Sequence, residues 1–369
     1  MSTKIYSIKQ LDTIEIKFPK KNLKGRYCLD PFITTNIDVN GNVRLCSCGT
    51  WLPTVVGNIR DSTIDEILNN DISHKIRQSI RDGTYEYCDE TKCGIINNDR
   101  LLKIEDITHD DAVDKLKSTY DRVFDTSVVE SPRQITFAGD LICNLSCPSC
   151  RTEIITETDE IKLDRNKIID LINQNLFSGS DSRWITIYLS LGGEVFASPL
   201  MLNFLENFPV DRYPRAELKF QTNGLLIKKR WSRIAHLKKN IFSITVTADS
   251  QDPVTYEKLR RGGKYESLIE NLEFIYQLKQ ELGFEFVLRM VLQNDNALEI
   301  RKFFDFAMKY NVDIVEYQFL QNQGTFTDEE YCKLDIMNPN HKLRTHVISE
   351  LRELRELHGS KVAIYQGSI

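Results

Sequence analysis

The sequence lacks the features that mark several classes of protein. No apolar run approaches the ~18–20 residues that a membrane-spanning helix needs, and the first residues contain neither an apolar signal-peptide core nor a small-residue cleavage site. Basic residues are not in excess, because 48 lysines and arginines stand against 53 aspartates and glutamates, a net charge of −5. This balance excludes a generally basic nucleic-acid-binding protein, although not a local basic patch. The six histidines show no metal-ligand spacing. We therefore expect a cytoplasmic protein with no membrane span and no nucleic-acid partner.

Cysteine is the residue type that is unusual in number and place. The 369 residues include nine cysteines, and all except Cys332 precede residue 151. A disulfide framework is typical of small secreted chains with an even count. This chain is large, and its 41% hydrophobic and 27% charged residues suit an ordinary globular core. Metal or iron–sulfur ligation is therefore the better hypothesis. Cys332 itself is expected to be a buried, inert thiol, with hydrogen donation to a substrate radical as the alternative.

The first predicted unit covers residues 1–97. The pair Asn40-Gly41 lies between alternating segments and predicts a β-hairpin over 37–45 with a two-residue turn. Apolar residues at helical spacing predict one helix that starts at Ser62 and ends at Asp82-Gly83.

The rest of the chain divides into a linker, a core and a tail. The polar, acidic residues 98–132 predict a linker, and residues 326–369 predict a C-terminal helical extension with a candidate last strand at 362–365. Between them, over 133–325, six predicted strands alternate with helices, which indicates a parallel sheet, open or partly closed into a barrel. The six strands are expected at 134–138, 184–191, 217–221, 242–248, 286–292 and 313–320.

Three cysteines form a compact motif directly after the first strand of this series. Cys143, Cys147 and Cys150 have the spacing C-x3-C-x2-C. Three thiolates on one short loop can hold three irons of a 4Fe–4S cluster, which leaves the fourth iron open to bind and act on a small molecule. Zinc is the competing interpretation, but a structural zinc site needs four ligands, and no histidine lies within 30 residues of this loop.

Together with further motifs in the same order, this loop resembles the radical S-adenosylmethionine (SAM) superfamily. Segments 191–194 (LGGE), 221–224 (QTNG), 246–249 (VTAD) and 256–260 (YEKLR) are similar to that family's GGE, TNG, V-S-x-D and Y-x-x-[IL]-R motifs. The resemblance covers residues 133–320. It implies that SAM lies against Ser149, Gly192, Gly193, Glu194, Thr222, Asn223, Thr247 and Arg260, with Glu194 near the SAM amino group and Arg260 near its carboxylate. Ser149 departs from the family, which often has an aromatic residue there.

The earlier cysteines resemble a second module, the SPASM/Twitch auxiliary-cluster module. Cys28 and Cys46 flank Gly41 in the pattern C-x12-G-x4-C, and Cys88-x4-Cys93 follows. The resemblance implies that Cys28, Cys46, Cys88 and Cys93 hold an auxiliary 4Fe–4S cluster, with Cys48 as an alternative fourth ligand and Trp51 as its cover. A zinc knuckle on the same cysteines is the alternative. The module usually follows the radical SAM core, so its order here is permuted.

These resemblances imply a fold and a chemistry. The fold class is α/β, a partial (β/α)6 TIM-like barrel preceded by a small cysteine-rich α+β iron–sulfur module, with the active site at the carboxyl ends of the barrel strands. The implied cofactors are SAM, a SAM-binding 4Fe–4S cluster and an auxiliary 4Fe–4S cluster, served by an electron donor such as flavodoxin or ferredoxin. Reductive cleavage of SAM would give a 5′-deoxyadenosyl radical that abstracts hydrogen from a substrate C–H bond.

The substrate is not specified by these motifs. Peptide or protein modification is slightly favoured, because most SPASM-type relatives act on peptides. No leader-peptide recognition segment is evident, so a dehydrogenase or epimerase acting on a carbohydrate or surface-polysaccharide precursor is the alternative. A non-catalytic iron–sulfur redox or scaffold protein is the hypothesis from another class.

Overall fold

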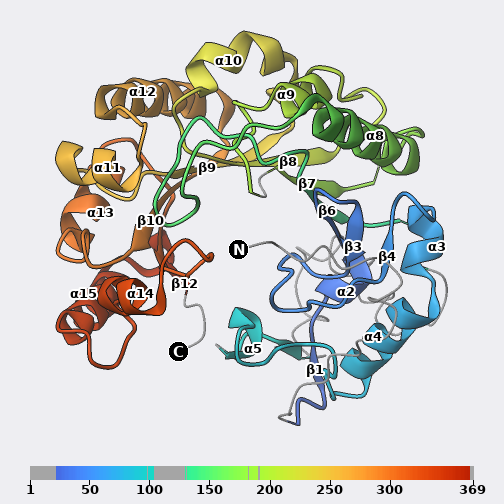
Figure 1. Cartoon of the computed structure of the whole chain (residues 1–369), viewed down its shortest axis with the longest axis horizontal. Coiled ribbons are helices and arrows are strands. Elements are labelled where there is room, and N and C mark those ends of the chain that lie inside the picture. The colour runs from blue at the N-terminus through green and yellow to red at the C-terminus, as the bar shows by residue number, and fades with distance from the viewer. Residues whose placement is uncertain are drawn as a thin grey trace. The chain divides into compact units, whose positions relative to one another are not determined.

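The computed structural model describes residues 22–97, 99–103, 129, 131–181, 183–189 and 192–365. Packing of the backbone divides the chain into two compact units, each described below by itself. The first comprises Met1–Phe137 with Lys167–Ser180, and the second comprises Ala138–Asn166 with Asp181–Gly367. Most of the predicted linker at 98–132 lies outside the described residues, as does Leu191 of the LGGE segment. Figure 1 labels the elements of both units.

The first unit contains a small sheet and short helices. Its sheet has the order β6-β2-β3-β4, in which β6 (Gln134–Phe137) is parallel to β2 (Thr34–Ile37), whereas β3 (Asn42–Arg44) and β4 (Gly57–Asn58) continue it antiparallel. A separate antiparallel pair joins β1 (Arg26–Tyr27) to β5 (Leu102–Lys103). The helices are α2 (Asp30–Ile33), α3 (Ile64–Leu68), α4 (Asp71–Arg81) and α5 (Gly94–Asn97).

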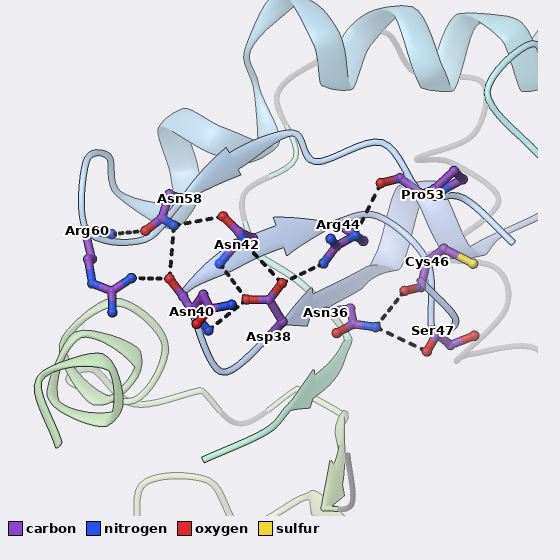
Figure 2. Close-up of polar contacts among 10 residues, drawn as sticks. All are labelled: Asn36, Asp38, Asn40, Asn42, Arg44, Cys46, Ser47, Pro53, Asn58 and Arg60. Atoms are coloured by element: carbon purple, nitrogen blue, oxygen red, sulfur yellow. Dashed lines mark hydrogen bonds and ion pairs between the residues drawn. The ribbon is translucent and has the colours of Figure 1, made fainter. Parts of the chain in front are cut away.

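The predicted hairpin is confirmed, but its turn is longer than two residues. Strands β2 and β3 pair with Ile37 opposite Val43, and the Asp38 N–H still donates to the Asn42 carbonyl at 3.0 Å. Of the turn residues only Gly41 has a positive φ, of 82°. A two-residue type I′ turn would need two such residues, whereas a three-residue loop with a glycine bulge needs one. The Asp38 carboxylate supports the longer loop by accepting the N–H groups of Asn40 and Asn42, at 2.9 and 3.1 Å (Figure 2).

The prediction of a single helix from Ser62 is wrong in its start and in its length. Its N-cap is Thr63, whose side chain accepts the Glu66 N–H in a reciprocal capping box, so α3 begins one residue later than a cap at Ser62 would place it. The helix also stops at Leu68, and α4 begins anew after Asn70, whose side chain accepts the Ser73 N–H at 2.9 Å. Asparagine competes with the helix by capping it, which the apolar periodicity alone does not reveal.

The second unit is built on a parallel sheet, as predicted. Its strand order is sequential from β7 to β12, and every determined pairing within it is parallel. The last strand, β12 (Val362–Tyr365), comes from the predicted C-terminal extension. It pairs with β11 at the edge of the sheet. The strands are β7 (Ile185–Leu189), β8 (Ala216–Thr222), β9 (Ile241–Thr247), β10 (Glu285–Leu292), β11 (Ile314–Phe319) and β12 (Val362–Tyr365).

Helices alternate with these strands and lie along the outer side of the curved sheet (Figure 1). Apolar side chains at every second strand position, such as Leu218, Ile244 and Leu288, are completely buried. The other positions carry mainly polar side chains, which is the alternation that a sheet with two unlike faces requires. The helices of this unit are α9 (Pro199–Glu206), α10 (Ile227–Ile234), α11 (Pro253–Leu259), α12 (Tyr265–Leu282), α13 (Ile300–Met308), α14 (Asp328–Leu334) and α15 (Arg344–His358); α8 (Asp159–Leu176) is shared between the units.

The structure therefore shows the α/β class and the large parallel sheet that the strand–helix alternation predicts. Helices α11 and α14 were not predicted, since α11 is only seven residues long and α14 buries none of its residues. Within the described parts of the chain, no helix combines the length and apolar character needed to cross a membrane.

The burial of a leucine predicts how much its replacement destabilises the second unit. Leu288 in β10 is fully buried, whereas Leu298 is 63% exposed. We expect Leu288→Ala to lower the free energy of unfolding of the metal-free protein by about 2–5 kcal/mol, because it removes buried methyl groups and leaves a cavity. The matched change Leu298→Ala should cost less than about 0.5 kcal/mol. Urea unfolding followed by circular dichroism measures both, and equal effects would contradict the assignment of the core.

Candidate active site and cysteine-lined cavity

The three-cysteine loop is an irregular segment of the second unit that presents its thiols to different degrees. Cys147 is buried, Cys143 is half-buried and Cys150 is exposed. A turn closes the end of the loop, where the N–H groups of Cys150 and Arg151 donate to the Cys147 carbonyl at 2.9 and 3.0 Å. Ser149 lies half-buried inside this turn. Burial raises the pKa of the Cys143 and Cys147 thiols.

Glu194 connects this loop to the end of the neighbouring strand. Its N–H donates to the Ile142 carbonyl at 2.7 Å, directly before Cys143. Its carboxylate, only 3% exposed, accepts the Thr222 hydroxyl at 2.7 Å and the Asn223 N–H at 2.6 Å. Burial raises the pKa of the Glu194 carboxyl, and these hydrogen bonds oppose that rise. In this structure the side chain predicted to meet SAM thus also holds the carboxyl end of β8.

Two glycines let the backbone segments approach each other before Glu194. A Cβ added to Gly193 would lie 2.9 Å from the carbonyl oxygens of both Asp140 and Ile142, which are backbone atoms that cannot easily move. Gly192 has a φ of 85°, a left-handed conformation that favours glycine. The residue type at 192–193 is therefore set by the close approach of the cysteine loop.

The TNG segment holds the other side of the loop. Thr222 is the last residue of β8, and the Asn223 side-chain amide donates to the Asn144 side chain at 2.8 Å and approaches the Cys143 sulfur at 3.9 Å. Thr222 and Asn223 are 3% and 4% exposed. Amide groups that point at a cysteine sulfur favour its thiolate form.

Arg260 forms a buried ion pair beside the same loop. Its Nη1 lies 3.3 Å from the Asp249 carboxylate, and Asp249, with a φ of 65°, is held by the Val291 N–H at 2.8 Å. Burial opposes the charge of Arg260, but the nearby Cys147 and Asp249 charges raise its pKa overall. Thr247, the last residue of β9, is 7% exposed two residues before Asp249.

Two buried polar atoms next to this pair have no partner among the described residues. They are Nε of Arg260 and the hydroxyl of Tyr256, which is completely buried. Burial raises the pKa of the Tyr256 phenol, and the Arg260 charge opposes that rise. A buried polar group without a partner is costly, so a ligand that bears hydrogen-bonding groups fits here. These two atoms without partners support the predicted role of Arg260 toward the SAM carboxylate.

Sequence reasoning missed the two arginines that clamp the cysteine loop. Arg151, 8% exposed, donates to the carbonyls of Leu141 and Gly192. Arg261 donates to the Ser146 hydroxyl at 3.1 Å and to the Thr152 carbonyl at 2.6 Å, while its own carbonyl accepts the Ser146 N–H at 3.0 Å. Both arginines adjoin motif residues in the sequence, but nothing in the motifs signals that they bind backbone carbonyls.

In the first unit, four cysteines line one cavity. Cys28, Cys46, Cys88 and Cys93 share it with Asp30. The other lining residues are Pro31, Trp51, Leu52, Tyr85, Ile95, Ile96 and Leu101, so the predicted cover Trp51 is present. Burial, followed by neighbouring acidic groups, raises the pKa of Cys88 to about 12. The Asp30 charge is among the causes that raise the pKa of all four thiols, after burial in each case.

The segment Cys46-Ser47 is fixed from two sides. The Asn36 side-chain amide donates to the carbonyls of Cys46 and Ser47, each at 3.2 Å (Figure 2). Asp30 accepts the Ser47 N–H at 3.0 Å and the Ser47 hydroxyl at 2.8 Å. Cys48 instead faces the Thr50 hydroxyl at 3.1 Å and does not line the cavity.

All nine cysteines carry free thiols, but Cys332 is not buried as predicted. It lies on α14, which buries none of its residues, so its thiol is exposed. Its apolar character alone favoured burial, whereas the position of the helix decides the exposure.

The donor sets fit iron–sulfur clusters better than a single ion. Across the described part of the chain, no group of three or more His, Cys, Asp or Glu side chains could hold one metal ion. A zinc knuckle would need four such ligands around one ion, whereas each cysteine of a 4Fe–4S cluster binds a separate iron. Three thiols on one loop and four around one cavity suit that second arrangement.

Comparison with known proteins adds to this geometry. Residues 28–94 match the SPASM family, described as an iron–sulfur cluster-binding domain. Two proteins named "Probable GTP 3′,8-cyclase", from two strains of Methanococcus maripaludis, are 26% and 25% identical over 131 and 134 residues. Each match spans 36% of this chain and 41% of the relative.

Similar solved structures include SuiB of Streptococcus suis, bound to S-adenosylmethionine or to its precursor peptide SuiA. The two show TM-scores of 0.43 and 0.45 at 13% and 14% identity, and cover 90% and 92% of this chain and 71% and 72% of SuiB. Another is anSMEcpe with bound AdoMet, with a TM-score of 0.40 at 17% identity, covering 63% of this chain and 62% of that one.

The family match lies within the first unit of the chain. Residues 28–94 match an iron–sulfur SPASM domain, which precedes the three-cysteine loop and the motifs of the second unit in the sequence. An iron–sulfur cluster is the cofactor that this family description implies.

The close approach at Gly193 generates a prediction about SAM binding. We expect Gly193→Ala to weaken SAM binding at least tenfold, because its Cβ would push the Asp140 and Ile142 carbonyls away and break the Glu194–Ile142 hydrogen bond. Gly179→Ala is the matched control, since a Cβ there meets no atom within 4 Å. Anaerobic equilibrium dialysis with labelled SAM measures both, and equal affinities would contradict this account of the loop.

Proposed function

We propose that this protein is a radical SAM enzyme that cleaves SAM reductively and abstracts a hydrogen atom from a substrate C–H bond. One observation carries the proposal: three thiols of one loop are held beside the carboxyl ends of a parallel sheet, close to two buried polar atoms, Nε of Arg260 and the Tyr256 hydroxyl, that have no partner among the described residues. With its cluster and SAM bound, the site gains reductive cleavage of SAM to methionine and a 5′-deoxyadenosyl radical.

The chain's own residues supply binding and positioning. Cys143, Cys147 and Cys150 would hold the cluster, and Arg260 would donate to the carboxylate of SAM. Glu194 holds the cysteine loop and the end of β8 together through its N–H and its carboxylate. A buried, pre-organised site excludes water from a reactive radical.

The polar face of the second unit's sheet supports a polar substrate. In the strand register Thr247 adjoins Arg289, which adjoins Glu316, and the last two form an ion pair at 2.6 Å. Further along this face Lys219 lies over the rings of Tyr188 and Phe242, at 5.1 and 4.6 Å from their centroids. This face therefore offers both hydrogen-bond donors and hydrogen-bond acceptors, which a substrate rich in amide or hydroxyl groups requires.

We propose a peptide or protein as the substrate, as the resemblance to the SPASM-type proteins implies. The same polar face suits the second candidate, a carbohydrate precursor acted on by a dehydrogenase or epimerase. Flavodoxin or ferredoxin would supply the electron. Since thiols persist in a reducing compartment, we also propose a cytoplasmic location.

We further propose the division of the chain into a SPASM/Twitch-like module over 1–97, a linker over 98–132, a radical SAM core over 133–325 and an extension over 326–369. In the module, Cys28, Cys46, Cys88 and Cys93 would hold the auxiliary 4Fe–4S cluster.

Reaction with SAM tests the enzyme proposal. Anaerobically reconstituted protein should contain about eight irons per chain, as two 4Fe–4S clusters require, and should release 5′-deoxyadenosine from SAM after reduction with dithionite. We expect Cys150→Ala to abolish 5′-deoxyadenosine and to lower the iron content to about four. Cys332→Ala, an exposed cysteine on α14, is the matched control and should retain both. Retained 5′-deoxyadenosine release in Cys150→Ala would contradict the cluster assignment of this loop, whereas no release from the parent protein would favour the scaffold hypothesis.

Deuterium transfer separates the two substrate classes. Deuterated peptides and deuterated nucleotide sugars are offered in parallel, and mass spectrometry measures deuterium in the released 5′-deoxyadenosine. We expect transfer from a peptide, because of the SPASM module. Transfer from sugars alone would replace the peptide proposal by the carbohydrate one and leave the radical SAM activity intact.

A further inference from the structure

The cysteine-lined cavity of the first unit contains an acidic side chain that the cluster assignment does not use. Asp30 lies two residues after Cys28 and lines the cavity with all four thiols. It is partly buried, and no lysine or arginine among the described residues forms an ion pair with it. Within the described part of the chain, its charge is therefore not balanced by an ion pair.

The position of this carboxylate is well defined. Its Oδ2 accepts the Ser47 N–H and the Ser47 hydroxyl at 3.0 and 2.8 Å and lies 3.6 Å from the Cys46 sulfur. These two donors fix the position of this oxygen. On its other side the Cys46-Ser47 segment is held by Asn36 (Figure 2). The carboxylate thus stands at a fixed distance from the thiol predicted to bind iron.

We propose that Asp30 is a positioning and tuning residue of the auxiliary site, whose negative charge lowers the reduction potential of the cluster held there. This inference rests on the auxiliary cluster of the proposed function. Reduction adds one electron to the cluster while the reductant loses one. A fixed negative charge close by in a medium of low dielectric disfavours that addition. Net charge around a cluster is one of the factors that set its potential.

Asp30→Asn tests the inference, because the amide keeps the size and one acceptor for Ser47 but loses the charge. The variant is made in full-length protein that also carries Cys143→Ala, Cys147→Ala and Cys150→Ala, so that the auxiliary cluster alone is observed. Redox titration with dithionite, followed by electron paramagnetic resonance, measures the potential. We expect the equilibrium constant for reduction to rise at least tenfold, which is about 59 mV for a one-electron couple.

Two controls separate charge from structure. Asp30→Glu keeps the charge and should stay near the parent potential. Asp65→Asn removes a carboxylate from an exposed position on α3 in the same unit, where solvent screens its charge, and should leave the potential unchanged. A shift in Asp65→Asn equal to that of Asp30→Asn would overturn the inference.

The outcomes also distinguish this inference from the function on which it rests. Absence of iron in the parent variant would overturn the auxiliary cluster and the inference together. Iron present with an unchanged potential in Asp30→Asn would overturn the inference alone. Loss of the cluster only in Asp30→Asn would make Asp30 a ligand and would likewise overturn the tuning role.

Discussion

The carboxylate of Glu194 is buried, and it accepts hydrogen bonds from Thr222 and from the Asn223 backbone while its own N–H binds the Ile142 carbonyl. These contacts tie the cysteine loop to the ends of two neighbouring strands. The close approach leaves no space for a side chain at Gly193, and it brings the Asn223 amide to the sulfur of Cys143. The geometry of the candidate active site depends on this one group, since a buried carboxylate keeps its partners together or incurs a large desolvation cost.

The cysteine-lined cavity depends on a comparable constraint in a different form. The three-residue loop of the hairpin, supported by Asp38 and Gly41, turns the chain back so that Cys46 reaches the cavity that Cys28 lines. Asp30 and Asn36 both bind the Cys46-Ser47 segment, through the Ser47 N–H and the Cys46 carbonyl. In both sites, a polar side chain that is not a predicted metal ligand keeps the cysteine-bearing loop in place. This is the supporting role that outer-shell groups have in metal sites.

Much of the fold could be predicted from local patterns. The six strands, the long helix α12 over Tyr265–Leu282 and the hairpin follow from periodicity and turn residues that act over a few positions. Asn69-Asn70 interrupts the first unit's helix although the apolar spacing continues across it, because a capping side chain competes with the helical hydrogen bonds. Cys332 was expected to be buried from its residue type, yet it is exposed, since α14 contributes nothing to the core.

By itself, the sequence determined the cysteine spacing, the glycine and carboxylate motifs at the strand ends, and hence the class of chemistry, because ligand type and spacing are local properties of the chain. Only the tertiary structure decided which polar groups serve those motifs. Arg151 and Arg261 clamp the three-cysteine loop, and Asp30 lines the thiol cavity. Tyr256 and Arg260 each have one buried atom without a partner among the described residues. Such roles depend on contacts between segments distant in the chain and on the cost of burying charge, and neither is encoded in a spacing.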